Sequence, residues 1–169
     1  MEEVIKCVVV GDARIGKTDL LKKFSKGRYI PADYESQHIT SFENCNVEGV
    51  TVDGEPYCLK LFDTGSLDDS LASRQHLYPN TDIFLVCFSV VLPESFENVK
   101  TKWIPEIKLQ CPKPKFVIIG LQADLRHTLK NTFAGDKNEP IATDEGQKLA
   151  KELGAIKYVE CSTQAKVMF

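Results

Sequence analysis

Apolar residues occur along this chain in blocks that have two different spacings. Near-continuous apolar runs, typical of strands buried on both faces, lie at residues 4–10, 83–90 and 116–119. Each run is followed by a block with helical spacing of its apolar residues, at residues 17–26, 94–109 and 143–154. Strands that alternate with helices predict an α/β fold with an open, doubly wound, mostly parallel sheet.

Shorter blocks add one hairpin to this sheet. Residues 42–52 and 57–62 are strand-like and are joined by Asp53-Gly54, a strong turn signal, so one antiparallel strand is expected. The pattern also predicts an irregular helix over residues 67–77 and a short last strand over residues 157–159.

Individual residues refine the predicted helices. Pro105 should kink or interrupt the helix in which it lies. Thr143 is a predicted N-cap, with Asp144 and Glu145 placed favourably in the first turn. Residues 126–139 are polar with little periodicity and predict a surface insertion.

The length of 169 residues fits a single domain over residues 1–169 that can bury a sizeable core. An open sheet of this kind needs a final helix to cover one face, and Val167-Met168-Phe169 has the pattern of its beginning. We therefore expect a chain truncated before or within its last helix.

Composition and charge narrow the class of protein. A formal net charge of −3 argues against a general nucleic-acid binder and leaves no basic membrane patch. The six cysteines include no C-x-x-C pair, so buried free thiols are favoured over disulfides or a metal site. The N-terminus is not a signal peptide and no apolar run is long enough to span a bilayer, so a cytoplasmic location is expected.

One motif dominates the chemistry of the chain. Residues 11–18 read G-x-x-x-x-G-K-T between a predicted strand and a predicted helix. A tight glycine-bearing turn lets backbone N–H groups and a helix N-terminus converge on a triphosphate. Lys17 would reach the β- and γ-phosphates, and the Thr18 hydroxyl would bind Mg²⁺.

Three further strand ends carry suitable side chains, and in doubly wound folds the ligand lies at that edge of the sheet. Asp63 is placed to hold Mg²⁺ through water, although a capping role fits it equally well. The other two ends are Leu121-Gln122-Ala123-Asp124 and Glu160-Cys161-Ser162-Thr163.

The order of these motifs resembles that of the Ras-like small GTPases, whose P-loop G domain has the predicted fold. Three segments resemble the Rho family in particular, namely residues 85–90, 95–99 and 103–107. The insertion at residues 126–139 lies where Rho proteins carry their insert helix. The resemblance covers essentially the whole chain and implies binding of GTP or GDP with Mg²⁺.

The resemblance assigns roles by position. Asp124 matches the aspartate that accepts hydrogen bonds from guanine, and Gln122 replaces the lysine whose stem packs on the base. Tyr29 matches an aromatic residue that packs against the base, although it fits equally well as a plug between its loop and the first helix. The other implied nucleotide-binding residues are Asp12, Ala13, Arg14, Ile15, Gly16, Asp19, Leu125, Ser162 and Thr163.

The first switch is longer than usual in this chain. Residues 39–44 resemble the Rho segment in which a threonine binds Mg²⁺ and the γ-phosphate. Thr40 is the expected ligand, with Ser41 and Ser36 as alternatives. Thr18, Thr40 and Asp63 (through water) are thus the implied metal-site residues.

The chain departs from the family at the residues that hydrolyse GTP. An ungapped alignment places Leu67 at the position of the glutamine that orients the attacking water, and a shift by one residue places Ser66 there. Ala13 replaces the usual loop glycine, and its Cβ would crowd the space for an arginine finger. Both changes predict slow or absent hydrolysis, similar to the GTPase-deficient Rnd branch.

Other readings of the site stay open. Arg14 could act as an arginine finger in cis, or Ser66 could replace the glutamine, and either would make an ordinary hydrolysing switch. Leu121 replaces a polar residue between the base loop and the phosphate loop and would weaken nucleotide affinity. A P-loop kinase or ATPase is disfavoured by Asp124. A buried carboxylate facing adenine would receive no hydrogen bonds of the kind that guanine donates, and unpaired buried polar groups are heavily penalised.

The resemblance also implies partners. Effector proteins would bind through the first and second switches, and exchange factors are further candidates, with roles in signal transduction and regulation of the cytoskeleton. A monomer that binds no nucleic acid is expected. Rho relatives end in a prenylated cysteine that is not present in this chain, so the inner face of the plasma membrane is expected only for a prenylated full-length form.

Overall fold

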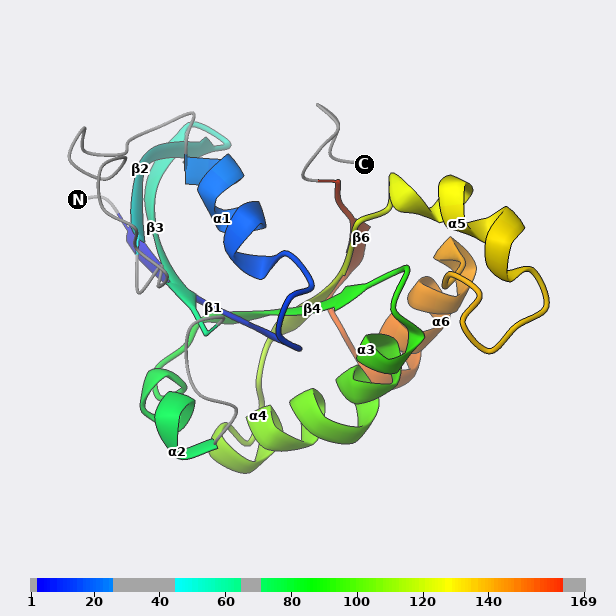
Figure 1. The fold of residues 1–169 in the computed structure, drawn as a ribbon. Helices are drawn as coiled ribbons and strands as arrows, with labels where there is room; N and C mark the ends of the chain where they lie inside the picture. Colours follow the sequence, from blue (N-terminus) through cyan, green and yellow to red (C-terminus); the bar gives the residue numbers. More distant parts are fainter. Residues whose placement is uncertain (1–2, 26–44, 65–70, 163–169) are drawn as a thin grey trace.

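The protein folds as one sheet with helices on both of its faces (Figure 1). The computed structural model describes residues 3–25, 45–64 and 71–162. Its six strands are in the order β2-β3-β1-β4-β5-β6. They are β1 (Glu3–Gly11), β2 (Cys45–Val52), β3 (Glu55–Asp63), β4 (Ile83–Ser89), β5 (Phe116–Leu121) and β6 (Tyr158–Glu160). The predicted doubly wound α/β fold is confirmed.

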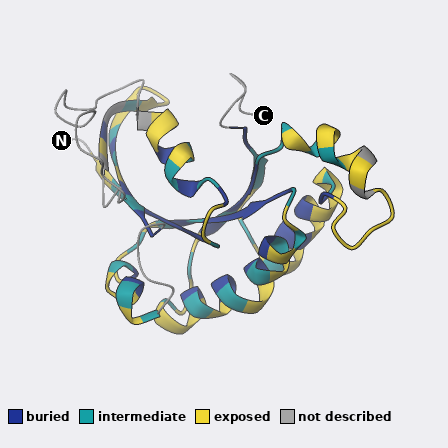
Figure 2. Ribbon diagram, viewed as in Figure 1, coloured by how far each residue is buried: buried dark blue, intermediate teal, exposed yellow. Residues whose placement is uncertain are grey.

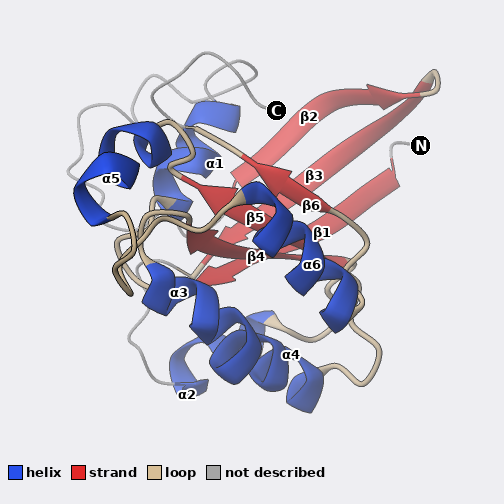
Figure 3. Cartoon of the chain, turned by 90° about the vertical axis from the view of Figure 1, so that its right-hand side faces the viewer, coloured by secondary structure: helices blue, strands red, loops and turns tan. Residues whose placement is uncertain are grey.

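Every neighbouring pair of strands is parallel except β2 and β3. These two form the predicted hairpin, whose turn at Asp53-Gly54 has left-handed backbone at both residues. Figure 3 shows the hairpin reaching out past the helices. The register shifts between Val47 and Val50, so β2 carries an irregularity near its middle.

The central strand divides the core into two halves. Val8 and Val10 of β1 point to one cluster, whereas Cys7 and Val9 point to the other, as alternation along a strand requires. Helix α1 (Lys17–Ser25) packs on the second cluster through Leu21. Burial is concentrated in the strands and on the inward faces of the helices (Figure 2).

Most of the other helices cover the first cluster (Figure 1). They are α2 (Leu71–Arg74), the 3₁₀ turn η2 (Gln75–Leu77), α3 (Pro93–Asn98), the π-helical turn η3 (Val99–Trp103), α4 (Ile104–Gln110) and α6 (Thr143–Leu153). Helices α3, η3 and α4 run end to end, and Pro105 is the second residue of α4. Regular α-helix is interrupted before Pro105, as predicted, by the wider turn η3.

One local prediction gains detail and another needs correction. The surface insertion begins with a helix, α5 (Leu125–Phe133), because Leu125 and Leu129 stand one helical turn apart. A pattern taken from residue 126 onward omits the first of them. Thr143 is the first helical residue of α6 rather than its N-cap; the backbone N–H of Ala142 instead donates to Glu145 Oε2 at 2.8 Å.

The cysteines of the described residues are free thiols, and most of them are buried, as predicted. Cys7, Cys58, Cys87 and Cys161 are buried free thiols, and Cys111 is partly buried. Burial raises the pKa of Cys87 to about 12, so this thiol stays protonated and acts as a packing group. No described helix has the length and hydropathy needed to cross a membrane.

Candidate nucleotide-binding site

The loop between β1 and α1 folds around the ammonium of Lys17. Its Nζ donates to the carbonyl oxygens of Gly11 at 2.8 Å and of Asp12 at 2.5 Å. The residue is 4% exposed. A buried ammonium at the N-terminus of a helix adds its charge to the positive end of the helix dipole, so this loop is suited to an anion.

Glycine is required at two points of this loop for different reasons. Gly11 has φ +147°, and a Cβ there would lie 2.4 Å from the carbonyl oxygen of Cys87. Gly16 has φ +99°, but a Cβ there would meet no atom within 4 Å. Gly11 therefore lets the loop pack on β4, whereas Gly16 leaves an open cradle beside the helix N-terminus.

A cavity of about 200 Å³ opens from this loop. It is lined by Arg14, Gly16, Lys17, Thr18, Asp19 and Gln122. The first five belong to the phosphate loop and the start of α1, while Gln122 follows β5. The structure thus brings a predicted base-contacting residue to the same hollow as the predicted phosphate-binding residues.

The predicted metal-site residues that the structure describes also meet. Thr18 Oγ1 donates to Asp63 Oδ2, and Asp63 is 2% exposed at the end of β3. Neighbouring Thr64 donates from Oγ1 to the carbonyl of Val9 at 2.7 Å, which fixes the end of β3 against β1. A hydroxyl and a carboxylate are the hard oxygen ligands that Mg²⁺ prefers.

The two predicted base loops lie beside each other at the ends of β5 and β6. The N–H of Ala123 donates to the carbonyl of Cys161 at 3.3 Å, and the N–H of Cys161 donates to the carbonyl of Gly120 at 2.8 Å. Asp124 begins α5 as its N-cap and makes no capping bond with its side chain. Ser162 is 4% exposed, and its carbonyl accepts a bond of 3.3 Å from Lys23 Nζ.

The sequence matches the Ras family over residues 6–169. The chain belongs to the Ras family. Members of this family are small GTP-binding signalling proteins that in general bind guanine nucleotides with Mg²⁺, effectors and exchange factors. The match covers the phosphate loop, Asp63 and both base loops together.

Asp12 was a predicted residue of this Ras-family site, but its two partners, Trp103 and Asn98, were not predicted from the sequence. Asp12 Oδ1 accepts a hydrogen bond from Trp103 Nε1 at 2.8 Å, and its Oδ2 accepts one from Asn98 Nδ2 at 2.7 Å. Trp103 reads in the sequence as an apolar position of a helix, and its indole N–H gives no periodic signal. Both oxygens of the loop carboxylate are thus fixed from the α3–η3 segment.

Gln122 has a partner that its motif does not indicate. Its Oε1 accepts a hydrogen bond from Ser89 Oγ at 2.5 Å, and its backbone is left-handed at φ 60°. The bond ties the loop after β5 to the end of β4. Leu121, which replaces a polar residue and is predicted to weaken nucleotide affinity, is fully buried in the core.

Other predicted site residues have simpler outcomes. Ala13 and Arg14 are exposed, Ile15 is buried, and Leu125 is 38% exposed. The remaining predicted residues lie outside the described part of the chain: Tyr29, Ser36, Thr40, Ser41, Ser66, Leu67 and Thr163.

Proposed function

We propose that this Ras-family protein is a Rho-like module that holds GTP with Mg²⁺, hydrolyses it slowly or not at all, and recruits effectors through its two switches. The observation that carries the binding proposal is the cradle of Lys17, which opens into a cavity reaching Gln122. The positive charge proposed to bind the phosphates (Lys17) and the side chain proposed to contact the base (Gln122) line the same cavity.

The residues present fit a magnesium nucleotide. The Lys17 ammonium binds β- and γ-phosphate oxygens in place of the loop carbonyls it now contacts. The Thr18 hydroxyl would hold Mg²⁺, with Asp63 holding it through water and Thr40 as the further switch ligand. Bound Mg²⁺ supplies charge neutralisation between the phosphates. Asp124 accepts from the guanine N1–H and amino group, which selects guanine over adenine.

The Rho-like part of the proposal rests on sequence and on one helix. Residues 85–90, 95–99 and 103–107 resemble the Rho family, and helix α5 occupies the start of the insertion. We extend the proposal to cytoskeletal signalling by a monomer in the cytoplasm, at the inner face of the plasma membrane in a prenylated full-length form.

Preferential retention of GDP over ADP by the purified protein tests the assignment of Asp124 to the guanine base.

Slow hydrolysis follows from two positions, the one that usually carries the glutamine and the one that usually carries the loop glycine. Neither Ser66 nor Leu67 offers the long amide that orients the attacking water, and Ala13 adds a Cβ to the exposed rim of the phosphate loop. An arginine finger contributes roughly 10³–10⁵ in rate, so crowding at that rim costs more than any other single change.

One observation favours an ordinary hydrolysing switch as a second candidate. Arg14 is exposed, yet it lines the phosphate-loop cavity and has left-handed backbone at φ 62°. A guanidinium there could stabilise the transition state in cis.

A single-turnover measurement on GTP-loaded protein separates the two candidates. Equally slow hydrolysis in the wild type and in Arg14→Ala supports the GTP-held module. Rapid hydrolysis in the wild type that is lost in Arg14→Ala supports the hydrolysing switch instead.

A further inference from the structure

A partly buried ion pair joins the two base loops close to both expected guanine contacts. Arg126 lies in the first turn of α5, two residues after Asp124, and Glu160 ends β6, two residues before Ser162. Arg126 donates from Nη1 to Glu160 Oε2 at 2.9 Å and from Nη2 to Oε1 at 2.5 Å. Their side chains are 16% and 11% exposed.

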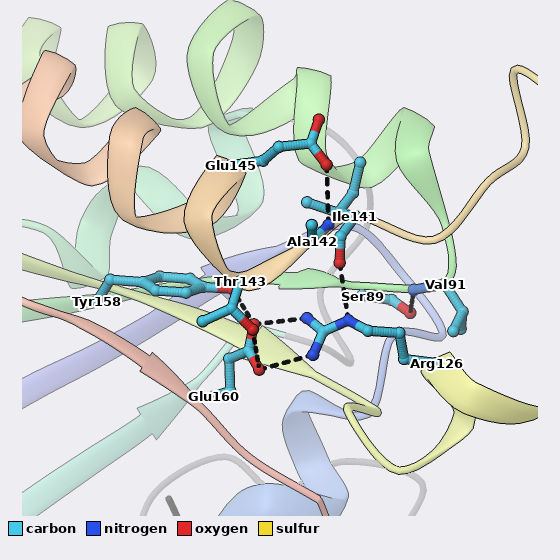
Figure 4. A network of polar contacts seen from close by, with 9 residues as sticks. All are labelled: Ser89, Val91, Arg126, Ile141, Ala142, Thr143, Glu145, Tyr158 and Glu160. Atoms are coloured by element: carbon cyan, nitrogen blue, oxygen red, sulfur yellow. Dashed lines mark hydrogen bonds and ion pairs between the residues drawn. The ribbon is translucent and has the colours of Figure 1, made fainter. Parts of the chain in front are cut away.

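Other residues complete this bidentate pair (Figure 4). Glu160 Oε1 also accepts from the Tyr158 hydroxyl at 2.8 Å, and Oε2 accepts from Thr143 Oγ1 at 3.2 Å. Each carboxylate oxygen therefore accepts two hydrogen bonds. Such a saturated acceptor holds one orientation, because any rotation breaks charge-assisted bonds.

Arg126 is fixed on its other side as well. Its Nε donates to the carbonyl of Ile141 at 2.9 Å, and the N–H of Ile141 donates to the carbonyl of Val90 at 2.7 Å. The guanidinium is thus held between Glu160 at the end of β6 and Ile141, which is itself bonded to the backbone just after β4. Its position depends on the sheet rather than on α5 alone.

The charges of the pair agree with this geometry. Burial raises the pKa of Glu160, but the hydrogen bonds from Arg126 and Tyr158 and the Arg126 charge outweigh it, and the pKa is lowered overall. The hydrogen bond to Glu160 raises the pKa of Arg126. Both groups are therefore ionised at neutral pH.

We propose that Arg126 and Glu160 are positioning residues that set the lifetime of the bound nucleotide and the selectivity for guanine. They fasten the loop of Asp124 to the loop of Ser162, so both contacts keep their spacing. This inference rests on the guanine-nucleotide binding proposed above. Breaking the pair would leave the phosphate loop and the backbone bond from Ala123 to Cys161 in place, but would remove the charged side-chain link that fixes the spacing of the two base loops.

The test measures dissociation of GDP that carries a fluorescent label on its ribose, in the presence of Mg²⁺. Arg126→Gln and Glu160→Gln are each expected to raise the dissociation rate roughly tenfold, equivalent to about 1.4 kcal/mol. The GDP dissociation rate of the double variant is expected to be no higher than that of the faster single variant, because the same interaction is removed in all three variants.

A second readout separates positioning from general stability. Inosine diphosphate lacks the amino group that Asp124 would accept from, so the ratio of its affinity to that of GDP reports this contact. In Arg126→Gln the preference for GDP is expected to fall several-fold. A purely structural role would lower the fraction of active protein but leave the preference of the active fraction at the wild-type value.

The chain offers a matched control in the exposed pair Lys100–Glu152, which joins η3 to α6 with an N–O distance of 2.6 Å and includes no residue of the base loops. Glu152→Gln should leave the dissociation rate unchanged. If Arg126→Gln fails to fold, Tyr158→Phe serves as a milder variant. It removes one hydrogen-bond donor to Glu160 but keeps the ring, whose centroid lies 6.2 Å from that of Phe88. It should raise the rate by a smaller factor.

The outcomes assign failure to one claim or the other. Wild-type dissociation rates and wild-type guanine preference in folded Glu160→Gln and Tyr158→Phe would overturn the positioning role. A wild-type protein that binds neither labelled GDP nor labelled GTP would instead overturn the proposed nucleotide binding.

Discussion

Trp103 donates its indole N–H to the carboxylate of Asp12, across 2.8 Å, and so joins the π-helical turn η3 to the phosphate loop. The ring is 2% exposed, and the Arg74 guanidinium lies 4.9 Å from the centre of one of its faces. Arg74 belongs to α2, which follows Ser66 and Leu67 in the sequence. The Trp103 side chain therefore connects the phosphate loop with α2.

We predict that Trp103→Phe destabilises the protein by about 1.5–3 kcal/mol, the range for a hydrogen bond to a charged group. The phenyl ring keeps most of the packing but cannot donate to Asp12. Trp103 is the single tryptophan, so unfolding in urea should be followed by circular dichroism.

Lys102→Met is the control for this substitution. It removes the cation that lies 4.5 Å from the same ring but keeps the indole N–H bond. Its expected cost is about 1 kcal/mol or less. Equal stability of Trp103→Phe and the wild type would show that the bond to Asp12 contributes nothing to the folded state.

A second prediction concerns Gly11. In Gly11→Ala the new methyl group would lie 2.4 Å from a backbone oxygen of β4 and 2.9 Å from Ile15 Cδ1, so the phosphate loop must shift. Loss of nucleotide retention is expected, together with a lower midpoint of thermal unfolding. Gly135→Ala is the matched control, since Gly135 also has positive φ, +78°, but has no atom within 4 Å of the added Cβ.

This comparison distinguishes steric clash from backbone strain. Strain at positive φ acts in both variants, whereas the clash acts only in Gly11→Ala. Nucleotide retention that falls equally in both variants would contradict the packing role of Gly11.

A third prediction is a loss of stability in acid through Glu106. This carboxylate accepts from Arg74 at 2.7 and 2.6 Å and from the Tyr78 hydroxyl. Burial raises its pKa, but these bonds and the Arg74 charge outweigh burial, and the pKa lies below its usual value of 4.5. The unfolded chain then binds more protons than the folded one as the pH falls through this range, so acid favours unfolding.

Glu106→Gln isolates this contribution. At pH 7 it should lower stability by about 1–3 kcal/mol, because Arg74 loses its counter-charge. As the pH falls through and below the usual carboxyl value of 4.5, its stability should fall less steeply than that of the wild type. Glu152→Gln, in the exposed pair, should leave both the stability and its pH dependence unchanged. A slope in Glu106→Gln as steep as in the wild type would assign the acid sensitivity to other carboxylates.

The sheet and the phosphate loop could be predicted from the sequence because each is marked by a pattern of neighbouring residues. The apolar runs at residues 4–10 and 83–90 mark strands, and the glycine spacing marks the loop. Asp63 and Gln122 were also placed correctly at strand ends, since the carboxyl ends of parallel strands meet at one edge. These features depend on residues near each other in the chain.

The contacts that escaped prediction join residues far apart in the chain. Asp12 and Trp103 are 91 residues apart, and Arg126 and Glu160 are 34 apart. In the sequence, Trp103 is one more apolar residue of a helix and Arg126 one more charge in a polar insertion. Only the packing of η3 on β1, and of α5 beside β6, gives these side chains their partners.

A fourth prediction concerns hydrolysis directly. Combining Ala13→Gly with Leu67→Gln should raise the single-turnover rate of GTP hydrolysis, because it removes the Cβ at the loop and supplies an amide for the attacking water. Gln at position 67 alone should give a smaller gain. No increase in the double variant would mean that the geometry of the switch, rather than these two side chains, limits the rate.

The central claim is that the protein holds GTP, and the nucleotide carried by freshly purified wild-type protein tests it most directly. The protein is denatured, and the released nucleotide is identified by ion-exchange chromatography, with exchange against free GDP excluded by purification in its absence. Mostly GTP is expected, at close to one equivalent per chain. Mostly GDP would contradict slow hydrolysis and favour a working switch that uses Arg14 or Ser66.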